Sequence, residues 1–146
     1  GRDFLPESDL IAAMATARMR GVDVEIIVSD KNNQLIAKWA SDALLPELVK
    51  AGCTVYKTLG PFDHTKLVVV DEHWALIGST NFDPRSLRLN FEFNIECHSP
   101  PFARAMNTIL DVKRTGARRV TNHELATVSL PSRLRGGLAR LFLPYL

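Results

Sequence analysis

The chain has 146 residues and a formal net charge of +2, with 46% hydrophobic and 23% charged residues. This composition is ordinary for a globular protein, and the length is sufficient for one domain with a substantial core. No apolar run approaches the roughly 18 residues of a membrane-spanning helix, which argues against a transmembrane segment.

The first half of the chain predicts alternating helices and strands. Pro6 and the acidic residues after it favour the first turn of a helix, and Gly21 ends that helix. Residues 22–28 are apolar enough for a strand. A helix is expected over residues 34–50, and another strand over residues 54–59.

The second half opens on a motif strand. His64, Lys66 and Asp71 read H-x-K-x4-D, and residues 67–70 form an apolar run typical of a buried strand. Because side chains alternate along a strand, His64 and Lys66 project to one face. Asp71 has the opposite parity and lies at the far end. One face therefore carries an imidazole next to an ammonium, a combination that suits a bound anion.

A second strand returns toward the start of the first. Residues 71–73 predict a turn, and residues 74–77 predict a strand that ends in small residues, Gly78-Ser79-Thr80-Asn81. If the two strands pair as a hairpin, the end of the second lies near the head of the first. Ser79 and Asn81 are then expected beside the imidazole and the ammonium.

The remainder of the chain continues the alternation. Residues 91–97 predict a strand and residues 100–113 a helix. Residues 114–131 are expected to form a polar linker with a short helix near Glu124, and residues 132–146 a last amphipathic helix. Strands that alternate with helices indicate the α/β class.

The charge is concentrated near the C-terminus. Residues 1–112 carry 11 Lys/Arg and 15 Asp/Glu, a net charge of −4, whereas residues 113–146 carry 7 Lys/Arg and one acid, a net charge of +6. The basic tail, residues 114–146, is therefore the part best suited to anionic partners, including a membrane surface. A helix that packs on its own domain is the equally weighted alternative for residues 132–146.

The motif resembles that of a known superfamily. H-x-K-x4-D followed by G-S-x-N is similar to the signature of the phospholipase D superfamily. Residues 83–87 (D-P-R-S-L) and 90–94 (N-F-E-F-N) resemble bacterial cardiolipin synthases more narrowly. The resemblance covers nearly the whole chain. It implies a layered α/β/α fold with a mixed, largely parallel central sheet, in a single domain over residues 1–146.

The residue types suit phosphodiester chemistry. Cleavage requires charge neutralisation, a nucleophile and a proton for the leaving oxygen. His64 can attack phosphorus and form a phosphohistidine, or protonate the leaving group, while Lys66 and Asn81 hold the nonbridging oxygens. Ser79 can join them or brace the loop. The resemblance implies that Glu92 orients the active-site histidine, and a strand-face carboxylate is the alternative. We expect no metal or cofactor.

Other motif positions have structural or open roles. The resemblance gives Asp71 a backbone-bracing role, and Gly78 belongs to the structural part of the motif. Arg85 and Asn90 match family positions near the site without an assigned role. Asp63 stands where many relatives have an apolar residue, so its carboxylate is expected to affect the charge of the motif histidine.

The motif occurs once, whereas cardiolipin synthases carry it twice. The chain resembles a C-terminal half, so it is either a fragment or pairs with itself as a homodimer. The expected activity is transfer between two phosphatidylglycerol molecules, releasing glycerol, at the cytoplasmic face of a bacterial membrane. The alternatives are a dimeric single-motif phosphodiesterase or nuclease acting on nucleic acid, a phospholipase D-type hydrolase, and an anionic-lipid-binding half-domain without turnover.

Overall fold

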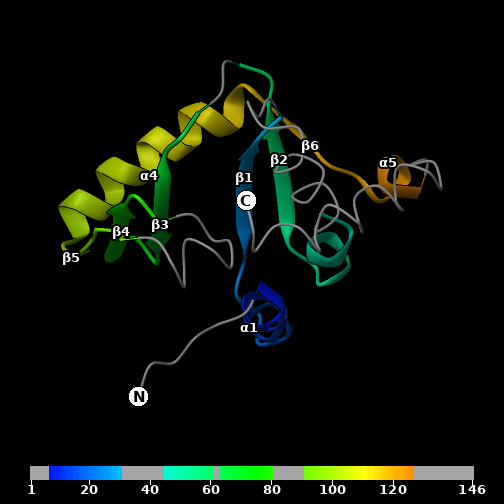
Figure 1. Ribbon diagram of the computed structural model, residues 1–146, viewed down its shortest axis with the longest axis horizontal. Helices are drawn as coiled ribbons and strands as arrows, with labels where there is room; N and C mark the ends of the chain where they lie inside the picture. Colours follow the sequence, from blue (N-terminus) through cyan, green and yellow to red (C-terminus); the bar gives the residue numbers. More distant parts are fainter. Residues whose placement is uncertain (1–6, 31–44, 61–62, 81–90, 127–146) are drawn as a thin grey trace.

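The computed structural model describes residues 7–30, 45–60, 63–80 and 91–126 (Figure 1). Residues 45–50 are helical. The other helices and strands follow in chain order: α1 (Glu7–Met19), β1 (Glu25–Ser29), β2 (Thr54–Thr58), β3 (Lys66–Val70), β4 (Trp74–Gly78), β5 (Asn94–His98), α4 (Pro100–Thr115), β6 (Ala117–Arg119) and α5 (Asn122–Ala126).

The strands form two three-stranded sheets, in the orders β1-β2-β6 and β3-β4-β5. The pair β1–β2 is parallel, and the other three described pairs are antiparallel. The predicted α/β class with mixed strand pairing is confirmed. Among the described strands, antiparallel pairs outnumber the one parallel pair, whereas the prediction was a largely parallel sheet. For β3 and β4 the reason is their short connection, because a turn of a few residues joins only antiparallel strands.

The buried core lies against one side of β1, and a cavity separates β1 from α4. The buried core consists of Leu45, Leu48, Cys53, Val55 and Val120, with side chains of β1 and α1 packed against it. Ile26 of β1 belongs to this side, whereas Ile27, of opposite parity, lines a cavity together with Leu110 of α4. Figure 1 shows α4 beside β3 and apart from α1. This arrangement places helices in separate layers around the strands.

The turn between β3 and β4 is a tight hairpin connection. Asp71 and Glu72 have φ values of 49° and 54°, and the His73 N–H donates to the Val70 carbonyl at 3.1 Å. Two consecutive residues with positive φ are typical of a type I′ turn, whose twist matches that of paired strands. The predicted turn is confirmed. The turn leaves Asp71 at the end of β3 opposite to His64.

The region after α4 differs from the predicted linker. Residues 114–131 contain a strand, β6, whose Arg119 pairs with Tyr56 of β2, and the helix α5, which confirms the short helix near Glu124. The strand was missed because Ala117–Arg119 shows no apolar alternation. An edge strand is held mainly by backbone hydrogen bonds, which a sequence pattern does not record.

Several predicted features lie outside the described residues. These are Asn81, Arg85, Asn90, most of the predicted helix over residues 34–50, and the whole of the predicted helix over residues 132–146.

Gly78 is required by a close approach between two strands. It lies opposite Lys66 of β3 on one side and Asn94 of β5 on the other. A Cβ atom added at this position would lie 2.1 Å from Asn94 Oδ1 and 2.4 Å from the Phe93 carbonyl oxygen. Only a residue without a side chain lets β5 approach this closely.

We expect Gly78→Ala to lower the free energy of unfolding by about 1–3 kcal/mol, because the added methyl group forces β4 and β5 apart. Urea denaturation measures this loss. Gly60→Ala is the matched control, because a Cβ there meets nothing within 4 Å. Equal effects of the two substitutions would contradict the close-approach argument.

Candidate active site

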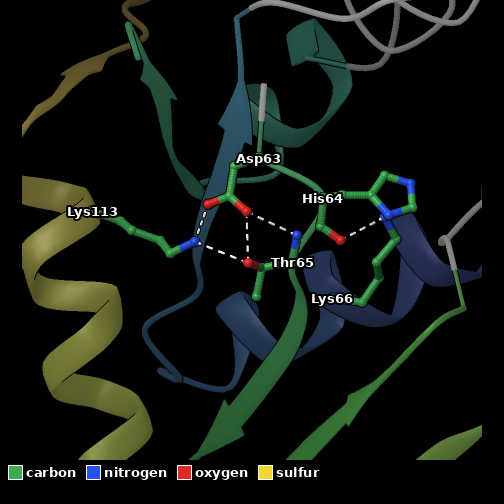
Figure 2. A network of polar contacts seen from close by, with 5 residues as sticks. All are labelled: Asp63, His64, Thr65, Lys66 and Lys113. Carbon is green, nitrogen blue, oxygen red and sulfur yellow. Dashed lines mark hydrogen bonds and ion pairs between the residues drawn. The ribbon is translucent and has the colours of Figure 1, made fainter. Parts of the chain in front are cut away.

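The head of β3 separates two sets of side chains. Figure 2 shows the His64 ring and the Lys66 side chain on one side of the strand, and Asp63 and Thr65 on the other. The Lys66 ammonium donates to the His64 carbonyl oxygen at 2.9 Å. His64 is exposed and Lys66 is half-buried. An ammonium has three N–H donors, so this bond is compatible with donation to an anion as well.

The end of β4 reaches the same end of the sheet. Gly78, its last residue, pairs with Lys66, the first residue of β3. The two strands therefore pair as the predicted hairpin. Ser79, the residue after Gly78, accordingly lies near the start of β3. Asn81, the next predicted phosphate ligand, lies outside the described residues.

Ser79 is held by the segment that leads into β5. Its hydroxyl donates to Glu92 Oε2 at 2.5 Å and accepts from the Phe93 N–H at 3.0 Å. Its own N–H donates to the Phe93 carbonyl at 3.0 Å. A serine hydroxyl has one proton to donate, and here Glu92 receives it. Of the two roles considered for Ser79, this geometry favours bracing the loop.

The next residue is held in the same way. Asn94 Nδ2 donates to Thr80 Oγ1 at 2.6 Å. Ser79 and Thr80 are thus both anchored to β5 or to the residues just before it. The predicted hydrogen bond between Glu92 and the His64 ring stays a prediction; the partner recorded for Glu92 is Ser79.

The opposite side of β3 carries an ion pair that the sequence did not indicate. The Lys113 ammonium, from the last turn of α4, contacts the Asp63 carboxylate and donates to Thr65 Oγ1 at 3.1 Å (Figure 2). Hydrogen bonds from Lys113 and Thr65 lower the pKa of Asp63 far below its usual range. The carboxylate is therefore fully charged at neutral pH.

This pairing revises the expectation for Asp63. Its side chain is directed toward Lys113, away from the His64 ring (Figure 2), and its charge is compensated there. Lys113 was missed as a site-related residue because it lies 50 positions away in the sequence. No local pattern connects the two residues.

The described residues contain neither a metal-binding cluster nor a membrane-spanning helix. In that part of the chain, no group of three or more His, Cys, Asp or Glu side chains could hold a metal ion. None of its helices is long and apolar enough to cross a membrane.

The fold places the chain in a structural class. A solved structure of similar fold is Nuc from Salmonella typhimurium, a phospholipase D family member, with a TM-score of 0.70 and 22% sequence identity. The match covers 81% of this chain and 77% of that chain. The chain therefore has a phospholipase D-like α/β fold.

Sequence similarity identifies the family within that class. The family described as cardiolipin synthase, PLD-like domain, matches residues 3–113, and the chain belongs to this family. Its curated relatives include cardiolipin synthase A of Klebsiella pneumoniae and of Salmonella arizonae. Each is 43% identical over 108 residues, which cover 74% of this chain and 22% of the relative. The chain thus spans about a fifth of their length.

We expect Ser79→Ala to lower the free energy of unfolding by roughly 1–2 kcal/mol, because it removes a hydrogen bond to a charged acceptor and leaves Glu92 without this donor. Thermal denaturation measures the loss. Thr108→Ala is the control, because it removes an exposed hydroxyl that donates to Arg104 O within α4. A Ser79→Ala effect no larger than that of the control would contradict the bracing role.

Proposed function

We propose that the chain is the C-terminal catalytic half of a cardiolipin synthase-type phosphatidyltransferase. The observation that carries this proposal is the His64 and Lys66 pair on one face of β3, at the point where β4 returns, in a chain of the cardiolipin synthase family. The imidazole and the ammonium suit a phosphodiester, and the substrate class follows from the family. The substrate is a phosphatidylglycerol-like phospholipid.

The proposed reaction is a transesterification in two displacements. A histidine nitrogen attacks phosphorus, and the bond from phosphorus to the oxygen of the headgroup glycerol breaks. That oxygen takes up a proton, and free glycerol leaves. The glycerol hydroxyl of a second phosphatidylglycerol then loses its proton and attacks the phosphohistidine, which releases the histidine. The products are cardiolipin and glycerol. Lys66 and Asn81 stabilise the nonbridging oxygens, Glu92 orients the imidazole, and Ser79 braces the loop.

A complete site needs a second motif. One His64 cannot attack phosphorus and also protonate a leaving oxygen on the opposite side. The second histidine comes from an N-terminal half absent from this sequence, or from a second copy of the chain. The described surface supports a partner, because Phe93 and Ile95 are 72% and 51% exposed close to Glu92 along the chain.

The rest of the chain fits a membrane-associated enzyme. Residues 1–146 form one phospholipase D-like domain in this proposal. Its basic tail, residues 114–146, contacts anionic lipid at the cytoplasmic face of the membrane.

One alternative has a specific observation in its favour. The structural match to Nuc covers most of both chains, so a phospholipase D family member of comparable length exists as a separate chain. This observation supports a dimeric single-motif phosphodiesterase, acting on nucleic acid or lipid. A half-domain that binds anionic lipid without turnover is the remaining alternative.

The substrate is tested by incubating the chain separately with phosphatidylglycerol vesicles and with plasmid DNA. We expect cardiolipin and free glycerol from the vesicles and intact DNA, measured by lipid chromatography and gel electrophoresis. His64→Ala is expected to lower the rate by about 10²–10⁴-fold, because it removes the nucleophile or the proton donor.

The matched control is His98→Ala, which removes another exposed histidine of the same sheet, at the end away from Gly78. It is expected to retain the wild-type rate. Nicked DNA without cardiolipin would favour the phosphodiesterase alternative, and vesicle binding without any product would favour the lipid-binding half. A large loss of thermal stability in His64→Ala would point instead to a structural histidine.

Self-association is tested by size-exclusion chromatography with light scattering. We expect a dimer that Phe93→Glu dissociates, because a charge placed on the exposed apolar surface opposes its burial. Val112→Glu is the control, because Val112 is similarly exposed, at 71%, but lies near the end of α4 and not beside β5. A monomer at all concentrations would leave only the missing N-terminal half as the source of the second motif.

A further inference from the structure

Three side chains form a connected network beside the motif histidine. Asp63 Oδ1 accepts hydrogen bonds from the Thr65 N–H at 2.9 Å and from Thr65 Oγ1 at 2.6 Å. Lys113 of α4 contacts the Asp63 carboxylate and donates to Thr65 Oγ1 at 3.1 Å. Asp63 and Thr65 are the two neighbours of His64 in the chain. We refer to Asp63, Thr65 and Lys113 as the clamp (Figure 2).

The clamp restrains the backbone conformation of His64. A carboxylate that accepts from the N–H two residues later closes an Asx turn, which holds the residue between them in one conformation. Here that central residue is His64. Lys113 then ties this turn to α4, so the turn cannot shift along β3 without breaking the ion pair.

The ion pair lies beside a cavity and is partly shielded from water. The Lys113 side chain is 23% exposed and that of Asp63 is 37% exposed. Both line a cavity of about 70 Å³ with the apolar residues Ile27, Leu67 and Leu110. Partial exclusion of water strengthens the attraction between the charges. It also makes either charge costly when its partner is removed.

We propose that Lys113 is a positioning residue for His64, acting through Asp63 and Thr65 to hold the imidazole in place for an anionic phosphate group. This inference rests on the proposed function of His64. Lys113 itself lies on the side of β3 opposite the imidazole (Figure 2). Its influence reaches the site only through the shared backbone of residues 63–65.

A merely structural role predicts a different outcome. In that case the ion pair ties α4 to β3, and its loss lowers stability without changing the motif histidine. The two roles are separated by observing His64 directly. Its imidazole Cε1–H signal in the NMR spectrum is identified by its absence in His64→Ala, and its position reports the placement of the ring.

The main variant is Lys113→Met, which removes the charge but keeps a side chain of similar length beside Ile27, Leu67 and Leu110. We expect the His64 signal to move and the Kd for inorganic phosphate, measured by titration of the same signal, to rise about 3- to 30-fold. Lys113→Arg, which keeps the charge, is expected to retain the wild-type signal and Kd.

The matched control is Arg114→Met, in the same last turn of α4. Arg114 pairs with Glu25 of β1 at 2.8 Å and with Asp111 at 2.7 Å, so its loss also removes ion pairs of α4. Neither of these ion pairs includes a clamp residue. We expect Arg114→Met to leave the His64 signal and the phosphate Kd unchanged.

A double-mutant cycle keeps the test valid where a single unpaired charge disturbs the fold. Asp63→Asn combined with Lys113→Met removes both charges. The effect of the double variant on the His64 signal is expected to be smaller than the sum of the single effects, because both residues act through one pair.

Three results would overturn the proposal: a wild-type His64 signal and Kd in Lys113→Met despite lower stability, an equal change in Arg114→Met, or strictly additive single effects. Failure of the proposed function is distinguishable from these. A wild-type chain that binds no phosphate would contradict the function, while the His64 signal in the variants would still report the clamp.

Discussion

The alternation of side chains along β3 and the three residues before it is the constraint on which the site depends. In an extended strand, neighbouring residues must point to opposite faces, whatever their chemistry. The three residues before β3 continue this alternation: His64 lies on the same side as Lys66, and Asp63 and Thr65 are directed toward α4 (Figure 2). The strand keeps the negative carboxylate away from the face that is proposed to bind an anion. It also couples the two faces mechanically, because they share one backbone.

The second requirement is that the neighbouring strands can approach β4 closely. β4 lies between β3 and β5, and Gly78 leaves room for Asn94 and Phe93 at its end. The residues after Gly78 are then within hydrogen-bonding distance of the chain that enters β5. Ser79 bonds to Glu92 and Phe93 as a consequence. The small residue of the motif thus acts through packing, and the polar residue after it acts through its hydrogen bonds.

The family assignment and the single motif together define what a complete site needs. The chain matches a cardiolipin synthase family over residues 3–113 but spans about a fifth of its curated relatives. In the proposed reaction, an in-line displacement uses groups on opposite sides of the phosphorus atom, and His64 supplies only one of them. Exposed apolar side chains such as Phe93 stand close in the chain to the polar residues of the motif. A partner that covers them would also exclude water from the site, and this would strengthen the interaction of Lys66 with an anion.

The sequence by itself determined the features that depend on short-range periodicity. The β3–β4 hairpin, the shared face of His64 and Lys66, and the short helix near Glu124 all follow from residues within a few positions of one another. The family also followed from local motifs, because H-x-K-x4-D and G-S-T-N are contiguous patterns. The tertiary structure decided what depends on packing between distant elements. Ser79 meets Glu92 across 13 positions, Lys113 meets Asp63 across 50, and β6 pairs with β2 without an apolar pattern of its own. These contacts exist because helices and strands pack at particular distances, and a side chain's partner depends on that packing rather than on its neighbours in the chain.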